Sequence, residues 1–286
     1  MILTDSTAAR VQASSVTGIV SASSSFLQFM QYAAMTVSTA ISGTIGIVKN
    51  GIGGLTLSGV CNYTGPTQIN AGQLAISSAS TLNGVISGAG QLAKTGATAL
   101  TLGGVNTYSG GTLSAPSASS GTISFAQNNA FGTGLFTSAG PSQIVCNASV
   151  TLSNNFQINA THSLQFRVTA AIYTLTISGN IAGSGSVNKT SNGRVHLDGT
   201  LTYTGSTNIT AGILRALQTN GASTATASFP LQGQPLAVSF NVPPTAGMTF
   251  RFFQGATVNT YATVTLTGAP GRTGTYNSAN STLTIA

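Results

Sequence analysis

The sequence predicts an all-β fold, a stacked parallel β-solenoid followed by a small C-terminal β domain. Only 4% of the 286 residues are charged and 41% are hydrophobic, whereas disordered chains are poor in apolar residues and rich in charge. A long repeat occurs three times, and within it apolar residues alternate with polar or small ones. No segment carries a sustained apolar stripe of helical period, so almost no helix is expected.

Three segments align without a gap at their start and define the repeat. They are ISGTIGIVKNGIGGLTLSG from Ile41, ISGAGQLAKTGATALTLGG from Ile86 and IAGSGSVNKTSNGRVHLDG from Ile181. Each copy has a lysine eight residues after its opening isoleucine and a tyrosine four residues after the glycine that ends its strand. The lysines are Lys49, Lys94 and Lys189, and the tyrosines are Tyr63, Tyr108 and Tyr203.

Alternation within each copy predicts a half-buried strand, at 55–58, 100–103 and 195–198, because successive side chains of a strand point to opposite faces. The first two lysines are 45 residues apart and the last two are 95 apart, close to twice that interval. With three short strands per turn, 45 residues correspond to about two coils, stacked roughly 4.8 Å apart. Such stacking satisfies backbone groups between coils and buries a continuous apolar column.

These residues resemble the autotransporter-associated β-strand repeat. The likeness covers roughly residues 41–74, 86–112 and 178–214, and the clearest stretch is ISGAGQLAKTGATALTLGGVNTYSGGT. The resemblance implies a right-handed parallel β-helix, as in bacterial passenger domains and in other secreted or phage-borne surface proteins. That family defines no catalytic residues, so the resemblance carries none over to this chain.

The pattern divides the chain into three parts. Residues 1–40 are expected to form an N-terminal arm or anchor, 41–217 the repeat solenoid, and 218–286 a linker with a C-terminal β-rich cap or oligomerisation domain. The arm carries apolar residues with no repeat to bury them, which generally marks an interface. A cap on the first coil is the alternative. The candidate anchor residues are Phe26, Leu27, Phe29, Met30 and Tyr32.

Charge and composition argue against most chemistry. The net charge of +7 arises because Asp5 and Asp198 are the only acids, and the nine basic residues are scattered, so nucleic-acid binding is not expected. Glycoside hydrolysis usually needs two flanking carboxylates, so we expect no enzyme; a polysaccharide lyase is the outsider. No metal or other cofactor is expected.

Two sets of polar residues are candidate surface features. Arg194, His196 and Asp198 take the outward positions of their strand and predict a small polar cluster. Lys49, Lys94 and Lys189 recur in register, which allows a basic stripe along one side of the solenoid, although solvated corner residues are the favoured interpretation.

We expect a non-catalytic structural protein of a bacteriophage virion surface, serving as capsid decoration, head fibre or tail fibre. The N-terminal arm lacks the pattern of a secretory signal, which favours assembly inside a host cell. The alternative is a secreted or cell-surface passenger or adhesin. Expected partners are further copies, with a homotrimer favoured because fibres commonly close by cyclic symmetry, other virion or cell-surface proteins, and surface glycans. Insertion into a membrane is not expected.

Overall fold

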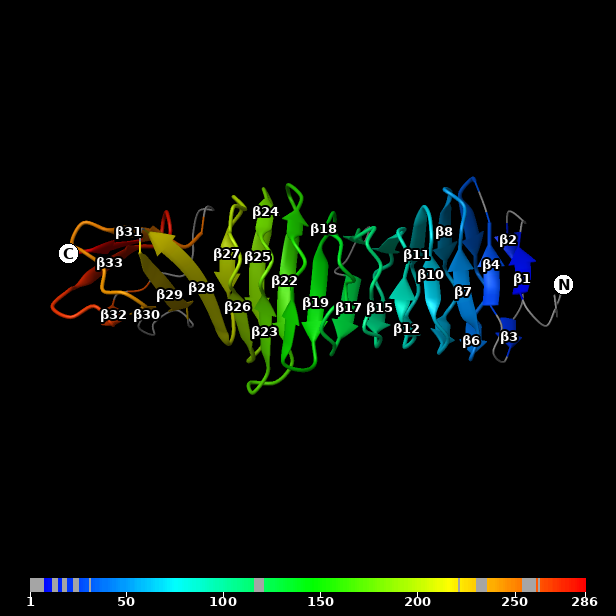
Figure 1. The fold of residues 1–286 in the computed structure, drawn as a ribbon, viewed down its shortest axis with the longest axis horizontal. Helices are drawn as coiled ribbons and strands as arrows, with labels where there is room; N and C mark the ends of the chain where they lie inside the picture. The colour runs from blue at the N-terminus through cyan, green and yellow to red at the C-terminus, as the bar shows by residue number, and fades with distance from the viewer. Residues whose placement is uncertain are drawn as a thin grey trace. The chain divides into compact units, whose positions relative to one another are not determined.

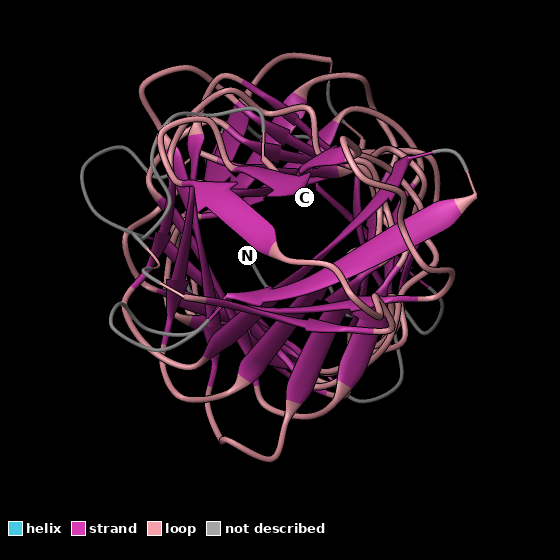
Figure 2. Ribbon diagram, turned by 90° about the vertical axis from the view of Figure 1, so that its left-hand side faces the viewer, coloured by secondary structure: helices cyan, strands magenta, loops and turns pink. Residues whose placement is uncertain are grey.

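The computed structural model describes residues 8–11, 15–16, 20–22, 26–30, 32–115, 121–220, 222–229, 236–253, 261 and 263–286. The chain divides into two compact units, Met1–Ile144 and Val145–Ala286. The described residues form strands and no helix (Figure 2), so none of them belongs to a helix able to cross a bilayer. Parallel strands stack into a β-solenoid, which confirms the predicted fold class.

The strands of the first unit lie on three faces. The first face holds β1 (Ala8–Val11), β4 (Phe26–Phe29), β7 (Gly46–Lys49), β10 (Thr67–Ile69) and β13 (Ile86–Ser87). The second face holds β2 (Ser15–Val16), β5 (Met35–Val37), β8 (Gly54–Leu57), β11 (Gln73–Ile76), β14 (Gln91–Lys94), β16 (Thr112–Ser114) and β18 (Phe136–Ser138). The third face holds β3 (Val20–Ala22), β6 (Ile41–Gly43) and β9 (Cys61–Tyr63), then β12 (Ser80–Leu82), β15 (Ala99–Leu102), β17 (Gly121–Phe125) and β19 (Ser142–Cys146), which reaches the boundary between the units.

Consecutive coils of the first unit pair in parallel, strand upon strand (Figure 1). Ile47 of β7 pairs with Thr67 of β10, and Leu74 of β11 pairs with Leu92 of β14, and each pairing marks the length of one coil. Leu55, Leu74 and Leu92 follow one another in register and are 0% exposed. Because burying a leucine side chain stabilises a fold by about 1.5–3 kcal/mol, these columns hold the coils together.

The repeat is longer than two coils, which corrects the prediction made from the lysine spacing. Ile41 opens β6 on the third face, whereas Ile86 opens β13 on the first face. From β7, which carries Lys49, to β14, which carries Lys94, the chain completes two coils and adds one further strand with its corner. Corresponding residues of the first two copies therefore lie on different faces.

The recurring tyrosines are interior residues. All three are 0% exposed. Each hydroxyl is hydrogen-bonded to the threonine four residues later, and the donor can be either partner. The pairs are Tyr63 with Thr67 at 2.7 Å, Tyr108 with Thr112 at 2.6 Å and Tyr203 with Thr207 at 2.6 Å. A buried hydroxyl without such a partner would be costly, so the sequence places tyrosine and threonine together.

The second unit begins with solenoid strands of its own and ends in a region of mixed pairing. Its solenoid strands are β20 (Val150–Leu152), β21 (Phe156–Ile158), β22 (Ser163–Val168), β23 (Thr174–Ile177), β24 (Ile181–Gly183), β25 (Ser186–Thr190), β26 (Arg194–Leu197) and β27 (Thr207–Ile209). The strands that follow are β28 (Ile213–Asn220), β29 (Ser223–Phe229), β30 (Leu236–Phe240), β31 (Thr249–Arg251), β32 (Val264–Thr267), β33 (Gly274–Asn277) and β34 (Thr282–Ile285).

β28 is the strand at which the solenoid ends. It pairs in parallel with β26 on one side and antiparallel with β29 on the other, so β29 covers an edge that would otherwise be open to pairing with another chain. Phe229 lies at the centre of an aromatic cluster behind this edge, with ring centroids 5.5 Å from Phe252 and 5.0 Å from Phe253. Tyr203 of the last coil lies 6.3 Å from Phe253. This geometry fits a cap, and the oligomerisation role stays a prediction.

Candidate functional site

The Arg194, His196 and Asp198 cluster lies on and just after β26, with its side chains on the outer side of the sheet. His196 is in register with Thr176 of β23 and with Arg215 of β28. Arg215 Nη2 donates a hydrogen bond of 3.1 Å to Asp198 Oδ1, and this ion pair is 31% exposed on both sides. The sequence prediction missed Arg215, because finding it needs the register between β26 and β28, which places it one coil after His196.

Burial is the main influence on the titration of the histidine in this cluster. Desolvation lowers the pKa of His196, Arg215 and Arg194 lower it further, and only Asp198 opposes them. Burial and the two arginines therefore favour the neutral form of the His196 imidazole. A partly exposed ion pair of this kind stabilises a fold by about 0.2–1 kcal/mol, so the cluster is a surface feature rather than a major source of stability.

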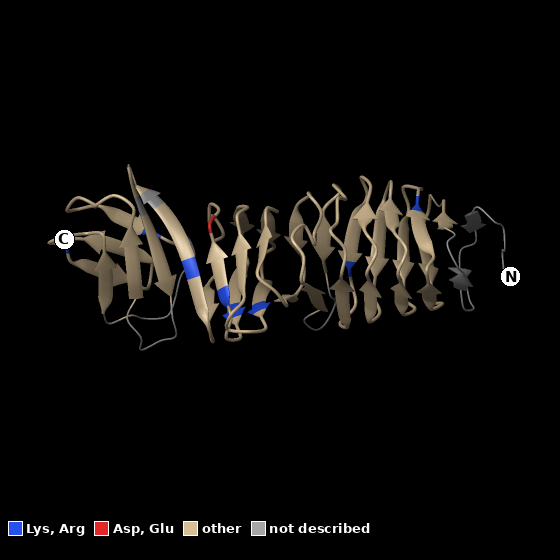
Figure 3. Cartoon of the chain, turned by 60° about the horizontal axis from the view of Figure 1, so that its bottom comes forward, with Lys and Arg blue, Asp and Glu red and all other residues tan. Residues whose placement is uncertain are grey.

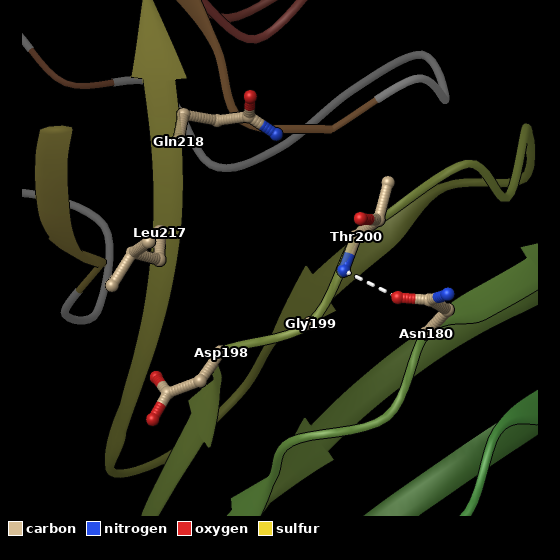
Figure 4. A pocket seen from close by; sticks show the side chains of 6 residues that line it. All are labelled: Asn180, Asp198, Gly199, Thr200, Leu217 and Gln218. Carbon is tan, nitrogen blue, oxygen red and sulfur yellow. Dashed lines mark hydrogen bonds between the residues drawn. The ribbon is translucent and has the colours of Figure 1, made fainter. Parts of the chain in front are cut away.

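A hollow of about 440 Å³ opens beside the cluster (Figure 4). It is lined by Asn180, Asp198, Gly199, Thr200, Leu217 and Gln218. It lies where β28 extends beyond its pairing with β26, which ends at Ala216, toward Asn220. The corner at 199–200 is held to the preceding coil, because Thr200 N donates a 2.9 Å hydrogen bond to Asn180 Oδ1.

The hollow offers hydrogen-bonding groups and one carboxylate. Paired-carboxylate hydrolysis uses two, and the second acid of the sequence, Asp5, lies outside the described residues. Within the described part of the chain, no three His, Cys, Asp or Glu side chains come together as a metal site would require. The arrangement can bind a polar ligand, and it offers no pair of groups for acid–base chemistry of that kind.

The structure contradicts both interpretations of the recurring lysines. Lys49, Lys94 and Lys189 are each 0% exposed, so they are not solvated corner residues. Lys49 lies on the first face and Lys94 on the second, so no basic stripe runs along one side of the first unit. Lysine and arginine are spread over several strands in Figure 3.

The physical reason is the period of the strand. Lys49 follows Ile47 by two residues and therefore points inward with it. It is in register with Phe29 and Ile69, which are both 0% exposed. The two-residue spacing from Ile47 thus marks the lysine as an interior residue.

The five candidate anchor residues differ in how far they are exposed. Leu27 and Phe29 of β4 are 4% and 0% exposed, because β4 pairs with β7 as a coil of the first unit; placing them on an anchor surface is therefore wrong. Phe26 is half-buried. Met30 and Tyr32 are 38% and 76% exposed, and an anchor role for these two stays a prediction. Residue 31 and most of segment 1–25 lie outside the described part of the arm.

Comparison with known families gives one match. The passenger-associated-transport-repeat model matches residues 47–76, 92–113 and 187–216. Three segments of the chain are therefore similar to this passenger-type repeat, in agreement with the resemblance found in the sequence. Neither a curated protein nor a solved structure matches the chain.

Proposed function

We propose that this chain is the scaffold of a secreted or cell-surface passenger-type protein and that it acts by binding rather than by catalysis. The observation that carries the proposal is the passenger-associated-transport-repeat match at three separate positions. This match favours the cell-surface alternative over the virion protein that the sequence suggested first, for which the repeat provides no specific support.

Each repeat has shared buried residues and variable outward residues, and this pattern supports a scaffold. The shared lysine and tyrosine of each copy are fully buried. On the strand that follows the lysine, the outward position holds Thr56 in the first copy, Thr101 in the second and His196 in the third. Outward residues can therefore change without disturbing the interior columns, which suits a surface that acquires different binding partners.

The hollow beside Asp198 is the candidate contact point for a polar, hydroxyl-bearing ligand such as a surface glycan. Its volume lies within the range of about 300–1,000 Å³ typical of ligand sites. Asp198, which follows β26, and Gln218 of β28 offer hydrogen-bonding groups from two different segments of the second unit. The absence of catalysis remains part of the proposal.

Location tests the proposal most simply. Antibodies raised against the folded chain should label intact producing cells or detect the protein in the medium, and protease added outside the cells should remove the label. Detection only inside cells, or only in purified phage particles, would overturn the proposal in favour of the virion alternative.

A further inference from the structure

We propose that the corner following each repeat lysine is a cation site built from backbone carbonyls, and that the lysine ammonium is the cation that joins one coil to the next. These three lysines are the only lysines of the chain. Each is the last or next-to-last residue of its strand, β7, β14 or β25. Its side chain lies inside the coil.

The third copy shows the site most completely. Lys189 Nζ donates hydrogen bonds to Thr190 O at 2.9 Å, Ser191 O at 2.6 Å and Ala211 O at 3.1 Å. The first two carbonyls belong to the lysine's own corner and the third to the next coil. An ammonium has three N–H donors and no acceptor, so three converging carbonyls match it donor for acceptor.

The first copy repeats the arrangement at the same offsets. Lys49 Nζ donates to Gly51 O, two residues on, and to Ala71 O at 3.0 Å, 22 residues on. Ser191 and Ala211 stand at these same offsets from Lys189. In the second copy Lys94 Nζ donates to Gly96 O, and the position corresponding to Ala71 lies outside the described part of the chain.

A glycine orients the alanine carbonyl of the next coil toward the lysine. Gly72 and Gly212 follow the two acceptor alanines and have φ of +66° and +72°. A positive φ at such a position turns over the preceding peptide relative to an ordinary type I turn. A Cβ at Gly212 would also lie 2.8 Å from Lys189 Nζ. This explains why the first and third copies both carry Ala-Gly at this place.

The site holds a cation without any carboxylate. Asp198, the one acid among the described residues, is paired with Arg215, and desolvation is the only cause of the lowered pKa of Lys189, which is about 8. The amine therefore stays largely protonated at neutral pH. A lysine that merely extended its head to water would be exposed at its tip, whereas all three are 0% exposed.

An emptied site should accept a free ammonium of the same shape. We would prepare Lys189→Ala and measure its melting temperature in n-butylammonium chloride and in tetramethylammonium chloride at equal concentration. Because a ligand that binds only the folded state raises stability by mass action, n-butylammonium should raise the melting temperature of the variant more than tetramethylammonium does. The wild type and Arg167→Ala, which removes an exposed side chain of neighbouring β22, should respond equally to both salts.

A Lys189→Ala variant whose melting temperature responds equally to both salts would overturn the proposal. If Lys189→Ala fails to fold, the wild-type protein can still be used to test the proposal. In protein labelled with ¹⁵N at lysine, three slowly exchanging ammonium signals are expected at pH 6, since each Nζ is shielded from water and hydrogen-bonded. Rapid exchange that erases all three signals would show free amines and would also overturn the proposal.

Discussion

Tyr108 shows how a polar group is accommodated in the interior of this solenoid. It is 0% exposed, and its hydroxyl is hydrogen-bonded to Thr112, which is 1% exposed. Burial raises the pKa of Tyr108 above the usual value for tyrosine, so the hydroxyl keeps its proton. Because neither partner can turn to water, the pair must be kept or removed as a unit.

Replacing one partner should therefore cost more than replacing both. Tyr108→Phe leaves the Thr112 hydroxyl buried without this partner, and we expect the free energy of unfolding to fall by about 1–3 kcal/mol. Tyr108→Phe with Thr112→Val should recover part of that loss in chemical denaturation. A double variant less stable than the sum of the two single changes would contradict the pairing.

The buried lysines give a pH dependence whose sign is unusual. Desolvation lowers the pKa of Lys94 to about 8 from its ordinary value of 10.5. Above pH 8 the unfolded state therefore binds more protons than the folded state, and the free energy of unfolding should rise with pH. The carbonyl contacts offset part of the cost of burying the charge, and deprotonation removes the remainder of that cost.

Denaturation at pH 7.5 and at pH 9 measures this rise, which should be smaller in Lys94→Met. From about pH 8 upward, the raised pKa of the Cys61 thiol, about 11, acts in the opposite direction to a smaller extent, because the unfolded thiol ionises first. Stability that falls steadily from pH 7.5 to 9 in the wild type would show that the lysines titrate at their ordinary value or above it.

At the scale of the element, residues at the corners limit how closely one coil can stack on the next. Gly53 and Gly54 are neighbours at one corner and look alike in the sequence, yet their surroundings differ. A Cβ on Gly53 would lie 2.2 Å from Ala33 O of the preceding coil, whereas a Cβ on Gly54 would meet nothing within 4 Å. Only one of the two glycines is required by the stacking of coils.

The two substitutions form a matched pair. Gly53→Ala should lower the free energy of unfolding by about 1–3 kcal/mol, the usual cost of overpacking, because a backbone atom of another coil must move. Gly54→Ala should change it little, since the space is open. Thermal or urea denaturation of the two variants beside the wild type is sufficient, and equal effects would mean that the coils do not approach as closely as described.

At the scale of the whole molecule, the sequence predicted what depends on local pattern. Alternation in segments such as 55–58 and the recurrence of lysine and tyrosine predicted strands, parallel stacking and the absence of helix in the described residues. The predicted number of coils per repeat was too low by one strand with its corner. Coil length follows from inter-coil register, as in the pairing of Leu74 with Leu92. Sequence spacing alone does not fix that register.

The candidate sites were predicted less well, for related reasons. The cluster of Arg194, His196 and Asp198 lies outward as expected, but its ion-pair partner Arg215 comes from the next coil. Lysine was assigned to the surface because charged residues are rarely buried, although its spacing from Ile47 pointed inward. The homotrimer stays a prediction, and its motive is weaker because Leu27 and Phe29 are interior residues.

The central claim is that the residues which define the repeat are interior parts of a scaffold and not a binding surface. Amine labelling followed by mass spectrometry tests it directly, because the chain has three lysines and each belongs to one copy. In the folded protein at pH 7.5, a small acylating reagent should modify the N-terminal amine and leave Lys49, Lys94 and Lys189 unmodified, and all three should react in denaturant. Lysines that react in the folded protein as fast as the N-terminus would contradict the account.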